Sequence, residues 1–257
     1  MIHLVTLSGN SKRFTDRGYD HKALCDINGS TMVEVFVKSW GDFHNHENIF
    51  LCRDEDLVSG KLRQEIRRVA PNSRIFGIET NTDGPVYSIS KIFNKLDDNQ
   101  PILISYIDTL QKTSIKRMLN DFESYDAGVT IHDFKNPHWR NGKSYCLVEF
   151  DDNMNVTNIV EKYPFTDVDF IDTRKSGSSG NYYFNSCATM KKYFKFLMDN
   201  DIRVNNEFYV TQAVEHMVKN GLKVKAHLCP YAALGVPEDL EDYAFWDRWH
   251  ETDFSQR

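Results

Sequence analysis

Apolar residues follow two alternating spacings along the first half of the chain. Short continuous apolar runs alternate with longer segments in which apolar residues recur every three or four positions. The first spacing is typical of buried strands and the second of amphipathic helices. Strands are expected at 2–7, 48–52, 73–79, 102–106 and 127–132. Helices are expected at 31–42, 54–70, 86–96 and 114–122.

The pattern changes in the second half of the chain. Strand-like runs at 144–150 and 156–162 flank the polar stretch DDNMN, which predicts a hairpin. The stretch RKSGSSGNYYF at 174–184 is interpreted as a small-residue loop that runs into an aromatic strand. Helices are then expected at 190–198, 207–220 and 238–249, with a strand at 223–228 and with the aromatic residues of the last helix packed on the body.

Together these elements predict the fold class. Strands that alternate with helices favour a parallel sheet covered on both faces. We therefore expect an α/β fold with a Rossmann-like, mostly parallel mixed sheet flanked by helices, and with an inserted antiparallel portion. The sequence shows no internal repeat and no low-complexity linker. One domain over 1–257 is therefore favoured over two.

Composition and charge narrow the classes of function. The net charge of −6 and the pI of about 5.8 argue against a dedicated nucleic-acid binder, which is normally basic. No apolar run is long enough to span a membrane, and the start of the chain does not resemble a signal peptide. Five widely spaced cysteines without a Cys-x-x-Cys pair indicate free thiols and no zinc site. We expect a cytoplasmic protein without membrane insertion.

Three polar segments follow predicted strands and carry candidate chemistry. They are LSGNSKRFTDRGYDHKAL at 7–24, TNTDGPVYS at 80–88 and YIDT at 106–109. Ligands of open α/β sheets bind beyond the carboxyl ends of the strands, so these loops meet if their strands are neighbours. Small residues at 8–11 let backbone N–H groups approach a phosphate.

Charged residues in these segments would suit a phosphorylated ligand. Lys12, Arg13 and Lys22 add positive charge to the first loop. Asp108 follows a buried strand and could hold Mg²⁺, which takes one or two carboxylates alongside phosphates and water. The Gly84-Pro85 pair opens a helix and could shape a nucleobase pocket.

Each of these features also has a structural interpretation. The first loop could be a solvated turn, and Asp108 could be the N-cap of the next helix. Gly84-Pro85 could be an ordinary turn before a helix. Glu161 and Lys162 could be a surface pair that contributes little to stability. The segment 177–180 could be a flexible connection.

The order of the motifs resembles the sugar-phosphate nucleotidylyltransferases, also called nucleoside-diphosphate-sugar pyrophosphorylases. The glycine, arginine, phenylalanine and lysine of that family's N-terminal signature match Gly9, Arg13, Phe14 and Lys22. The stretch ALCDINGSTMVEVFVKSW, at 23–40, is similar to the family's continuation into a helix.

Later segments extend the resemblance over most of the chain. GPVYS resembles the turn that helps hold the nucleotide, and ISYIDT resembles the strand that delivers the metal-binding aspartate, Asp108. NIVEK is similar to the pair that contacts the sugar phosphate, here Glu161 and Lys162. SSGNYYF resembles the segment that lines the acceptor pocket, with Gly180 and Asn181. NNEFYVTQAV and LGVPEDLEDY resemble the acidic helix start and the closing motif.

The resemblance implies an activity and a set of roles. A nucleoside triphosphate would be joined to a phosphorylated sugar or sugar-like acceptor, with release of pyrophosphate, for glycan precursor synthesis. Arg13 and Lys22 would be catalytic and Asp108 would hold Mg²⁺. Residues 1–135 would form the nucleotide-binding half, and residues 136–257 the acceptor-binding half with the C-terminal helix. The nucleotide-binding residues would be Leu7, Ser8, Gly9, Asn10, Thr80, Gly84 and Pro85, and the acceptor-binding residues Glu161, Lys162, Gly180 and Asn181.

Departures from the family pattern keep other functions open. Ser11 stands where glycine is usual, His21 where proline is usual, and Val236 where threonine is usual. Ala233 occupies the position of a second metal-binding aspartate, which Asp239 or Glu207 could replace.

Two alternatives to the transferase stay open. One is a nucleotide-sugar-dependent glycosyltransferase of the related fold, although the usual Asp-x-Asp motif lacks its first carboxylate at Tyr106. The other is a non-catalytic nucleotide-binding relative. The sequence leaves the base, the acceptor and a homo-oligomeric state undetermined.

Overall fold

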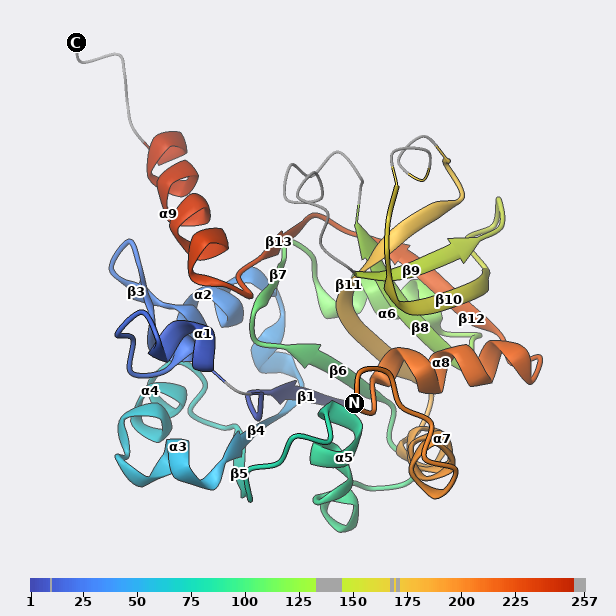
Figure 1. Cartoon of the computed structure of the whole chain (residues 1–257), viewed down its shortest axis with the longest axis horizontal. Coiled ribbons are helices and arrows are strands. Elements are labelled where there is room, and N and C mark those ends of the chain that lie inside the picture. The colour runs from blue at the N-terminus through green and yellow to red at the C-terminus, as the bar shows by residue number, and fades with distance from the viewer. Residues whose placement is uncertain (10, 133–144, 167–168, 170–171, 252–257) are drawn as a thin grey trace.

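A nine-stranded mixed sheet forms the centre of the computed structural model, which describes residues 1–9, 11–132, 145–166, 169 and 172–251 (Figure 1). The sheet path runs β10 (Val156–Tyr163), β9 (Tyr145–Phe150), β11 (Lys175–Phe184), β6 (Ile102–Tyr106), β1 (Ile2–Thr6), β4 (Glu47–Arg53) and β5 (Arg74–Ile78). Off this path, β8 (Ala127–His132) pairs with β11 and with β12 (Val224–Leu228).

The two parts of the sheet differ in strand direction. The strand β1 is parallel to β4 and β6, and β4 is parallel to β5. The strand β11 is antiparallel to β6, β8 and β9, and β10 is antiparallel to β9. The mostly parallel mixed sheet with an antiparallel portion is confirmed.

Helices cover both faces of the sheet because its strands are apolar on both sides. They are α1 (Lys12–Thr15), α2 (Met32–Ser39), α3 (Asp54–Val58), α4 (Lys61–Val69), α5 (Pro85–Ser90), α6 (Ile115–Phe122), α7 (Cys187–Asp199), α8 (Val210–Lys219) and α9 (Pro237–Glu251). Leu4 faces a core shared with α5, α7 and α8, and Val5 faces a core shared with α2, α4 and α6. Alternate residues of one central strand thus serve two cores.

Three elements differ from the sequence prediction. The helix expected over 54–70 is two helices, because Gly60 adopts a left-handed conformation between them. The helix expected over 86–96 ends at Ser90 and is followed by a short 3₁₀ turn, Phe93–Lys95. The small-residue stretch at 174–184 is not a loop: nearly all of it lies in β11, where it is buried between partner strands.

Two short ladders were not predicted, since strands of two or three residues leave no periodicity. The strand β13 (Tyr231–Ala233) pairs with β7 (Thr109–Gln111), so that Ala233 lies opposite Thr109. The strands β2 (Asp26–Ile27) and β3 (Ser30–Thr31) form a hairpin. The first ladder brings a late segment of the chain back to the loop that follows β6.

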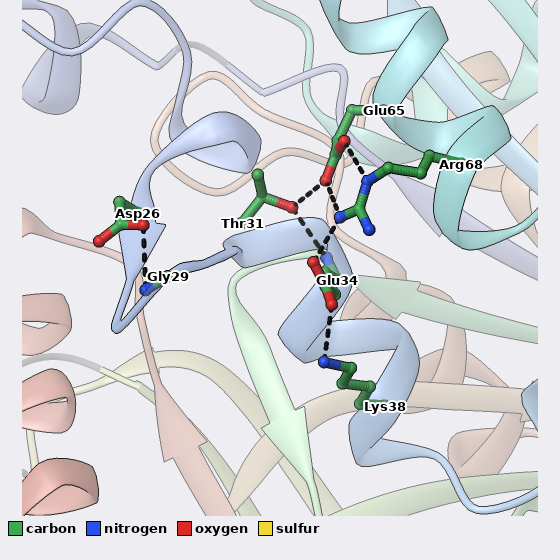
Figure 2. A network of polar contacts seen from close by, with 7 residues as sticks. All are labelled: Asp26, Gly29, Thr31, Glu34, Lys38, Glu65 and Arg68. Atoms are coloured by element: carbon green, nitrogen blue, oxygen red, sulfur yellow. Dashed lines mark hydrogen bonds and ion pairs between the residues drawn. The ribbon is translucent and has the colours of Figure 1, made fainter.

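A polar network joins α2 to α4, as Figure 2 shows. The Thr31 hydroxyl caps α2 by accepting from the Glu34 backbone N–H, and it donates to Glu65 at 2.6 Å. Arg68 binds both Glu34 and Glu65, and Lys38 pairs with Glu34 at 2.6 Å. Both helices contact the 3₁₀ turn Lys22–Leu24, so the network supports the turn that carries Lys22.

The last helix, α9, lies beside α1 and the β2–β3 hairpin and extends away from the sheet (Figure 1). Arg17 pairs with Glu238, and the Asn28 side chain donates to the Ala244 carbonyl at 2.9 Å. Tyr243 packs against the core as expected, whereas Trp246 is 55% exposed. The packing predicted for the aromatic residues of this helix is therefore only partly correct.

The five cysteines are free, as expected, and the structure places all five in buried positions. Across the described part of the chain, no helix combines the length and the apolar character needed to cross a membrane.

Candidate active site

Two neighbouring cavities open where β1 and β6 end. The loop cavity has a volume of about 340 Å³ and the tyrosine cavity about 460 Å³. The loop cavity is lined by Thr6, Ser8, Gly9, Lys22, Asn81, Thr82, Gly84, Pro85, Ser88, Tyr106, Asp108 and Glu207. The tyrosine cavity is lined by Arg13, Tyr106, Asp108, Thr109, Cys146, Glu161, Lys162, Ser178, Gly180, Tyr182, Tyr209, Tyr231, Ala233, Gly235, Val236 and Asp239. Tyr106 and Asp108 line both cavities and therefore join them.

Lys22 and Asp108 form an ion pair at this junction. The Lys22 Nζ lies 2.9 Å from Asp108 Oδ2, and the two side chains are 12% and 24% exposed. Asp108 lies two residues after the end of β6, and Lys22 begins the 3₁₀ turn. The order of the strands therefore brings together two residues that are far apart in sequence. Asp108 is not a helix N-cap: it lies between β6 and β7, and Ser114 caps α6 instead.

The predicted nucleotide-binding residues are divided between the loop cavity and other places. Ser8, Gly9, Gly84 and Pro85 line the cavity. Leu7 is fully buried in the core, with its N–H donating to the Leu51 carbonyl. Thr80 is exposed and lines neither cavity, and Asn10 lies outside the described residues.

Gly84 allows the start of α5 to approach the chain at Glu207. Its φ is +92°, and a Cβ there would lie 2.8 Å from the Phe208 carbonyl oxygen. The Val86 N–H donates to that same oxygen, and the Phe208 N–H donates to the Asp83 carbonyl. A side chain at position 84 would push apart the two segments that form this wall of the loop cavity.

An irregularity in β10 directs two consecutive side chains into the tyrosine cavity. Neighbouring residues of a regular strand point to opposite faces. Here the register shifts between Val160 and Tyr163, and Lys162 has a φ of +57°. Glu161 and Lys162 therefore both line the cavity, and the Lys162 Nζ lies 3.8 Å from Glu161 Oε1.

Glu161 is a buried carboxyl and not part of a surface pair. Its side chain is 9% exposed, and the Thr211 hydroxyl of α8 donates to it. Burial raises the pKa of Glu161, although the contacts with Thr211 and Lys162 oppose this effect. The carboxylate therefore destabilises the fold when it is ionised, as is common for groups placed for binding.

A second irregularity places Gly180 beside the strand that follows Asp108. The register of β11 shifts between Ser178 and Tyr182, and Gly180 has a φ of +84°. A Cβ at Gly180 would lie 2.9 Å from the Thr109 Cγ2, so only glycine fits without displacement. Gly180 lines the tyrosine cavity, whereas Asn181 does not.

Asn181 is buried beneath the cavity. Its Nδ2 donates to the Thr130 hydroxyl at 3.1 Å and to the Ser179 carbonyl at 3.3 Å. These contacts link β11 to β8 and leave the side chain away from the cavity surface. The placement supports a role in holding β11 rather than in touching a ligand.

Tyrosine side chains form much of the lining of the tyrosine cavity, and they were not predicted from the sequence as site residues. Tyr106 and Tyr182 meet edge to face with ring centroids 6.0 Å apart, and the Tyr182 and Ser178 hydroxyls lie 2.9 Å apart. Burial raises the pKa of Tyr106 and of Tyr182, so both phenols stay protonated at neutral pH. Tyr106 could have been noted in the sequence because it stands two residues before Asp108.

The charge set of the site would suit a cation that arrives with a phosphorylated ligand. Ala233 lies next to Asp108, because it pairs with Thr109 and because the Leu234 N–H donates to the Asp108 carbonyl. Position 233 therefore supplies no carboxylate. Of the two residues considered as replacements, Glu207 lines the loop cavity and Asp239 lines the tyrosine cavity. Within the described residues, no group of three or more His, Cys, Asp or Glu could hold a metal ion. Asp108 alone fits Mg²⁺ only with phosphate and water as its other ligands.

Replacing Glu161 by glutamine should stabilise the protein at pH 8. The amide keeps the shape and can accept from Thr211 but carries no buried charge. The folded-state pKa of Glu161 is raised, so the wild type loses stability as pH rises through that value and the variant does not. We expect a gain within the roughly 0.5–2 kcal/mol typical of single stabilising substitutions, measured by urea unfolding.

The gain should shrink at acidic pH, where the wild-type carboxyl is protonated. Glu149→Gln, on the neighbouring strand and partly exposed beside Lys175, is the matched control and should show no gain. Equal stability of Glu161→Gln and the wild type at pH 8 would show that burial of this carboxylate is not costly.

Comparisons with known proteins bear on the family and the fold. The family profile described as nucleotidyl transferase matches residues 19–228. None of the curated protein sequences matches the chain.

Solved structures show the same fold at low sequence identity. A nucleoside-diphosphate-sugar pyrophosphorylase from Vibrio cholerae RC9 is 19% identical with a TM-score of 0.75, over 95% of this chain and 100% of that one. A UDP-glucose pyrophosphorylase complexed with UDP-glucose is 15% identical with a TM-score of 0.73, over 98% and 99%. The inositol-1-phosphate CTP transferase from T. maritima is 12% identical with a TM-score of 0.68, over 97% and 96%.

Proposed function

The chain belongs to the nucleotidyl transferase family, and on that premise we propose that it joins a nucleoside triphosphate to a phosphorylated sugar or sugar-like acceptor with release of pyrophosphate. The observation that carries the proposal is the meeting of two cavities at the Lys22–Asp108 pair. A transfer between two substrates needs two adjoining sites with charged groups at their junction. This arrangement supports such a reaction.

We assign the triphosphate to the loop cavity. Ser8 and Gly9 follow β1, where small side chains let backbone N–H groups approach phosphate oxygens. Lys22 supplies a positive charge at the end of this cavity. The turn at Gly84 and the side chains of Asn81 and Ser88 form the opposite wall, where the base would lie.

We assign the acceptor to the tyrosine cavity. Lys162 and Arg13 would bind its phosphate, and the buried Glu161 carboxylate would accept hydrogen bonds from its hydroxyl groups. Arg13 is exposed and lines this cavity rather than the loop cavity. Its position therefore favours the acceptor phosphate over the leaving pyrophosphate as its partner.

The proposed reaction is an in-line displacement at the α-phosphorus. An oxygen of the acceptor phosphate forms the new P–O bond, while the bond to the β-phosphate breaks and pyrophosphate leaves. The contribution of the protein is alignment and stabilisation of negative charge. Lys22 would bind the phosphate oxygens whose charge grows, and the tyrosine hydroxyls would hold the acceptor in line.

Asp108 is the residue that would hold Mg²⁺, together with phosphate oxygens and water. The bound ion would neutralise phosphate charge in the triphosphate.

A panel assay tests the proposed function. The protein is mixed with ATP, CTP, GTP or UTP, Mg²⁺ and one phosphorylated acceptor, and pyrophosphate release is measured. Glucose 1-phosphate and inositol 1-phosphate enter the panel because the similar structures include a UDP-glucose pyrophosphorylase and an inositol-1-phosphate CTP transferase. We expect release only when triphosphate and acceptor are both present. A product of this kind would supply activated sugars for glycan assembly.

Three other outcomes would contradict the proposal. Release without an acceptor would indicate a hydrolase. Transfer of sugar from a nucleotide sugar, supplied in a separate incubation in place of the triphosphate, would support the glycosyltransferase alternative. Triphosphate binding with no release for any acceptor would support a non-catalytic relative.

Replacing Ala233 by aspartate should create a second carboxylate beside Asp108. Ala233 lines the tyrosine cavity and pairs with Thr109, so the new side chain would face the same junction. We expect Mn²⁺, used as a probe for Mg²⁺, to bind about tenfold more tightly in the absence of nucleotide, because the ion gains a second carboxylate ligand; a tenfold change corresponds to about 1.4 kcal/mol. Electron paramagnetic resonance of free Mn²⁺ measures this affinity.

The matched control for Ala233→Asp is Ala232→Asp. Ala232 is the preceding residue of the same strand, but it lines a different cavity. Its Mn²⁺ affinity should equal that of the wild type. Unchanged affinity in Ala233→Asp would show that position 233 does not share a cation with Asp108.

A further inference from the structure

His21 is buried directly before the residue that reaches the junction of the two cavities. Its side chain accepts from the Ala23 backbone N–H through Nδ1 at 3.1 Å and so caps the 3₁₀ turn Lys22–Leu24. The ring is only 5% exposed, although the segment before it is mostly exposed. A buried side-chain cap fixes the direction in which Lys22 leaves the backbone.

The backbone at His21 is not one that proline can adopt. Its φ is −162°, whereas the proline ring fixes φ near −65°. The turn therefore does not depend on a rigid residue at position 21. It depends on what holds the histidine ring.

A largely buried acidic residue lies on the other side of that ring. The His21 Nε2 lies 3.3 Å from Asp56 Oδ2, and the two side chains are 6% and 10% exposed. Because Nδ1 accepts from an N–H, the ring proton of the neutral histidine resides on Nε2 and faces this carboxylate. Asp56 thus places a negative charge beside the protonated nitrogen of the tautomer that caps the turn.

Asp56 in turn accepts two hydrogen bonds from an arginine. Arg53, at the end of β4, binds it through Nε and Nη2, each at 2.7 Å. This two-point contact leaves the carboxylate little freedom of orientation. Burial would raise the pKa of Asp56, but the contacts with His21 and Arg53 hold it below its ordinary value, so the carboxylate is charged at neutral pH.

These contacts form a continuous chain from the sheet to the candidate catalytic lysine. The chain runs from Arg53 through Asp56 and His21 to the turn of Lys22, whose Nζ lies 2.9 Å from Asp108. A displacement of about 1 Å at a reacting group can lower a rate about 100-fold. Buried groups that fix the direction of Lys22 would therefore preserve the rate of the proposed reaction.

We infer that His21 and Asp56 are positioning residues, which set the direction of Lys22 toward the phosphates by way of the capped turn. The inference rests on the proposed function, because it assigns these residues a purpose in that reaction. Neither side chain lines the loop cavity or the tyrosine cavity, so each acts through Lys22 and not on a substrate.

A double-mutant cycle with Lys22→Ala tests the inference. His21→Ala and Asp56→Asn should each lower kcat about tenfold or more, with a smaller change in the KM for triphosphate. In the Lys22→Ala background, His21→Ala should cause no further loss, because its effect passes through Lys22. His21→Asn should recover part of the loss, since an asparagine oxygen can also cap the turn.

Two results would overturn the inference. The first is a His21→Ala variant whose kcat stays within twofold of the wild type. The second is a loss in the double variant that equals the product of the two single losses, because a purely structural role gives independent effects. Asp56→Asn carries the test if His21→Ala does not fold.

The matched control is Asp20→Asn. Asp20 precedes His21 and pairs with Lys61 at 2.6 Å on the surface, but it does not touch the capped turn. Its kcat should equal that of the wild type. An equal loss in Asp20→Asn and His21→Ala would show that any change in this loop disturbs Lys22.

Calorimetry with inorganic pyrophosphate and Mg²⁺ separates this inference from the proposed function. If no acceptor supports turnover by the wild type, the proposed function fails, and affinity for pyrophosphate becomes the readout. His21→Ala should then weaken pyrophosphate binding when Lys22 is present. In the Lys22→Ala background it should cause no further weakening. Wild-type affinity in His21→Ala, or no binding by the wild type, would overturn the positioning role.

Discussion

Alanine at Lys22 is expected to lower kcat about 100- to 1,000-fold, the loss typical when one group that stabilises transition-state charge is removed. The Lys22 Nζ lies at the junction of the two cavities, 2.9 Å from Asp108. In the proposed reaction, negative charge grows on phosphate oxygens at this point. No other described lysine lines the loop cavity, so none can replace it there. Pyrophosphate release under saturating substrates measures the loss.

The fold should survive this change, since Lys22 belongs to neither apolar core and loses only its contact with Asp108. Circular dichroism and Tm establish that. Lys61→Ala, an exposed lysine at the start of α4, is the matched control and should keep wild-type turnover. Near-normal turnover in Lys22→Ala would remove Lys22 from the mechanism.

Asparagine at Asp108 is expected to lower kcat about 100-fold and to raise the Mg²⁺ concentration that gives half-maximal activity. The substitution keeps the shape of the side chain but removes the one carboxylate among the described residues that lines both cavities. A neutral amide is a weaker ligand for Mg²⁺ than a carboxylate. Activity measured across a Mg²⁺ titration separates the two effects.

Asp239→Asn tests the specificity of that result. Asp239 also lines the tyrosine cavity but does not line the loop cavity. Its Mg²⁺ titration should match that of the wild type. An Asp108→Asn variant whose half-maximal Mg²⁺ concentration is unchanged would show that Asp108 serves only to orient Lys22.

The parallel part of the fold could be predicted from the sequence because each strand is apolar on its own. The run at 102–106, which lies parallel to β1, is a strand with the predicted bounds. The small-residue stretch of β11 could not be identified, because its strand character comes from pairing with β6, β8 and β9 and not from apolar side chains. Tertiary pairing overrides weak local propensity there.

The candidate site was predictable where residues follow strand ends. Lys22, Asp108 and Glu161 line the two cavities. Each was predicted either because it follows a strand end or because it matches a family motif. Thr80 and Asn181 do not line the cavities, since a motif gives a residue's place in the chain but not the direction of its side chain. The chain of contacts from Arg53 through Asp56 to His21 could not be predicted from the sequence. Asp56 is distant from His21 in sequence, and the two side chains meet only in the folded protein.

Tyr106 and Asp108 form a wall common to both cavities, and in the proposed reaction this wall would couple the affinities of the two substrates. A ligand that fixes this wall from one side changes what the other ligand meets. Thermodynamic reciprocity then requires that the triphosphate changes the affinity for the acceptor by the same factor as the acceptor changes the affinity for the triphosphate. A dissociation constant measured with one substrate alone therefore describes half of a coupled equilibrium.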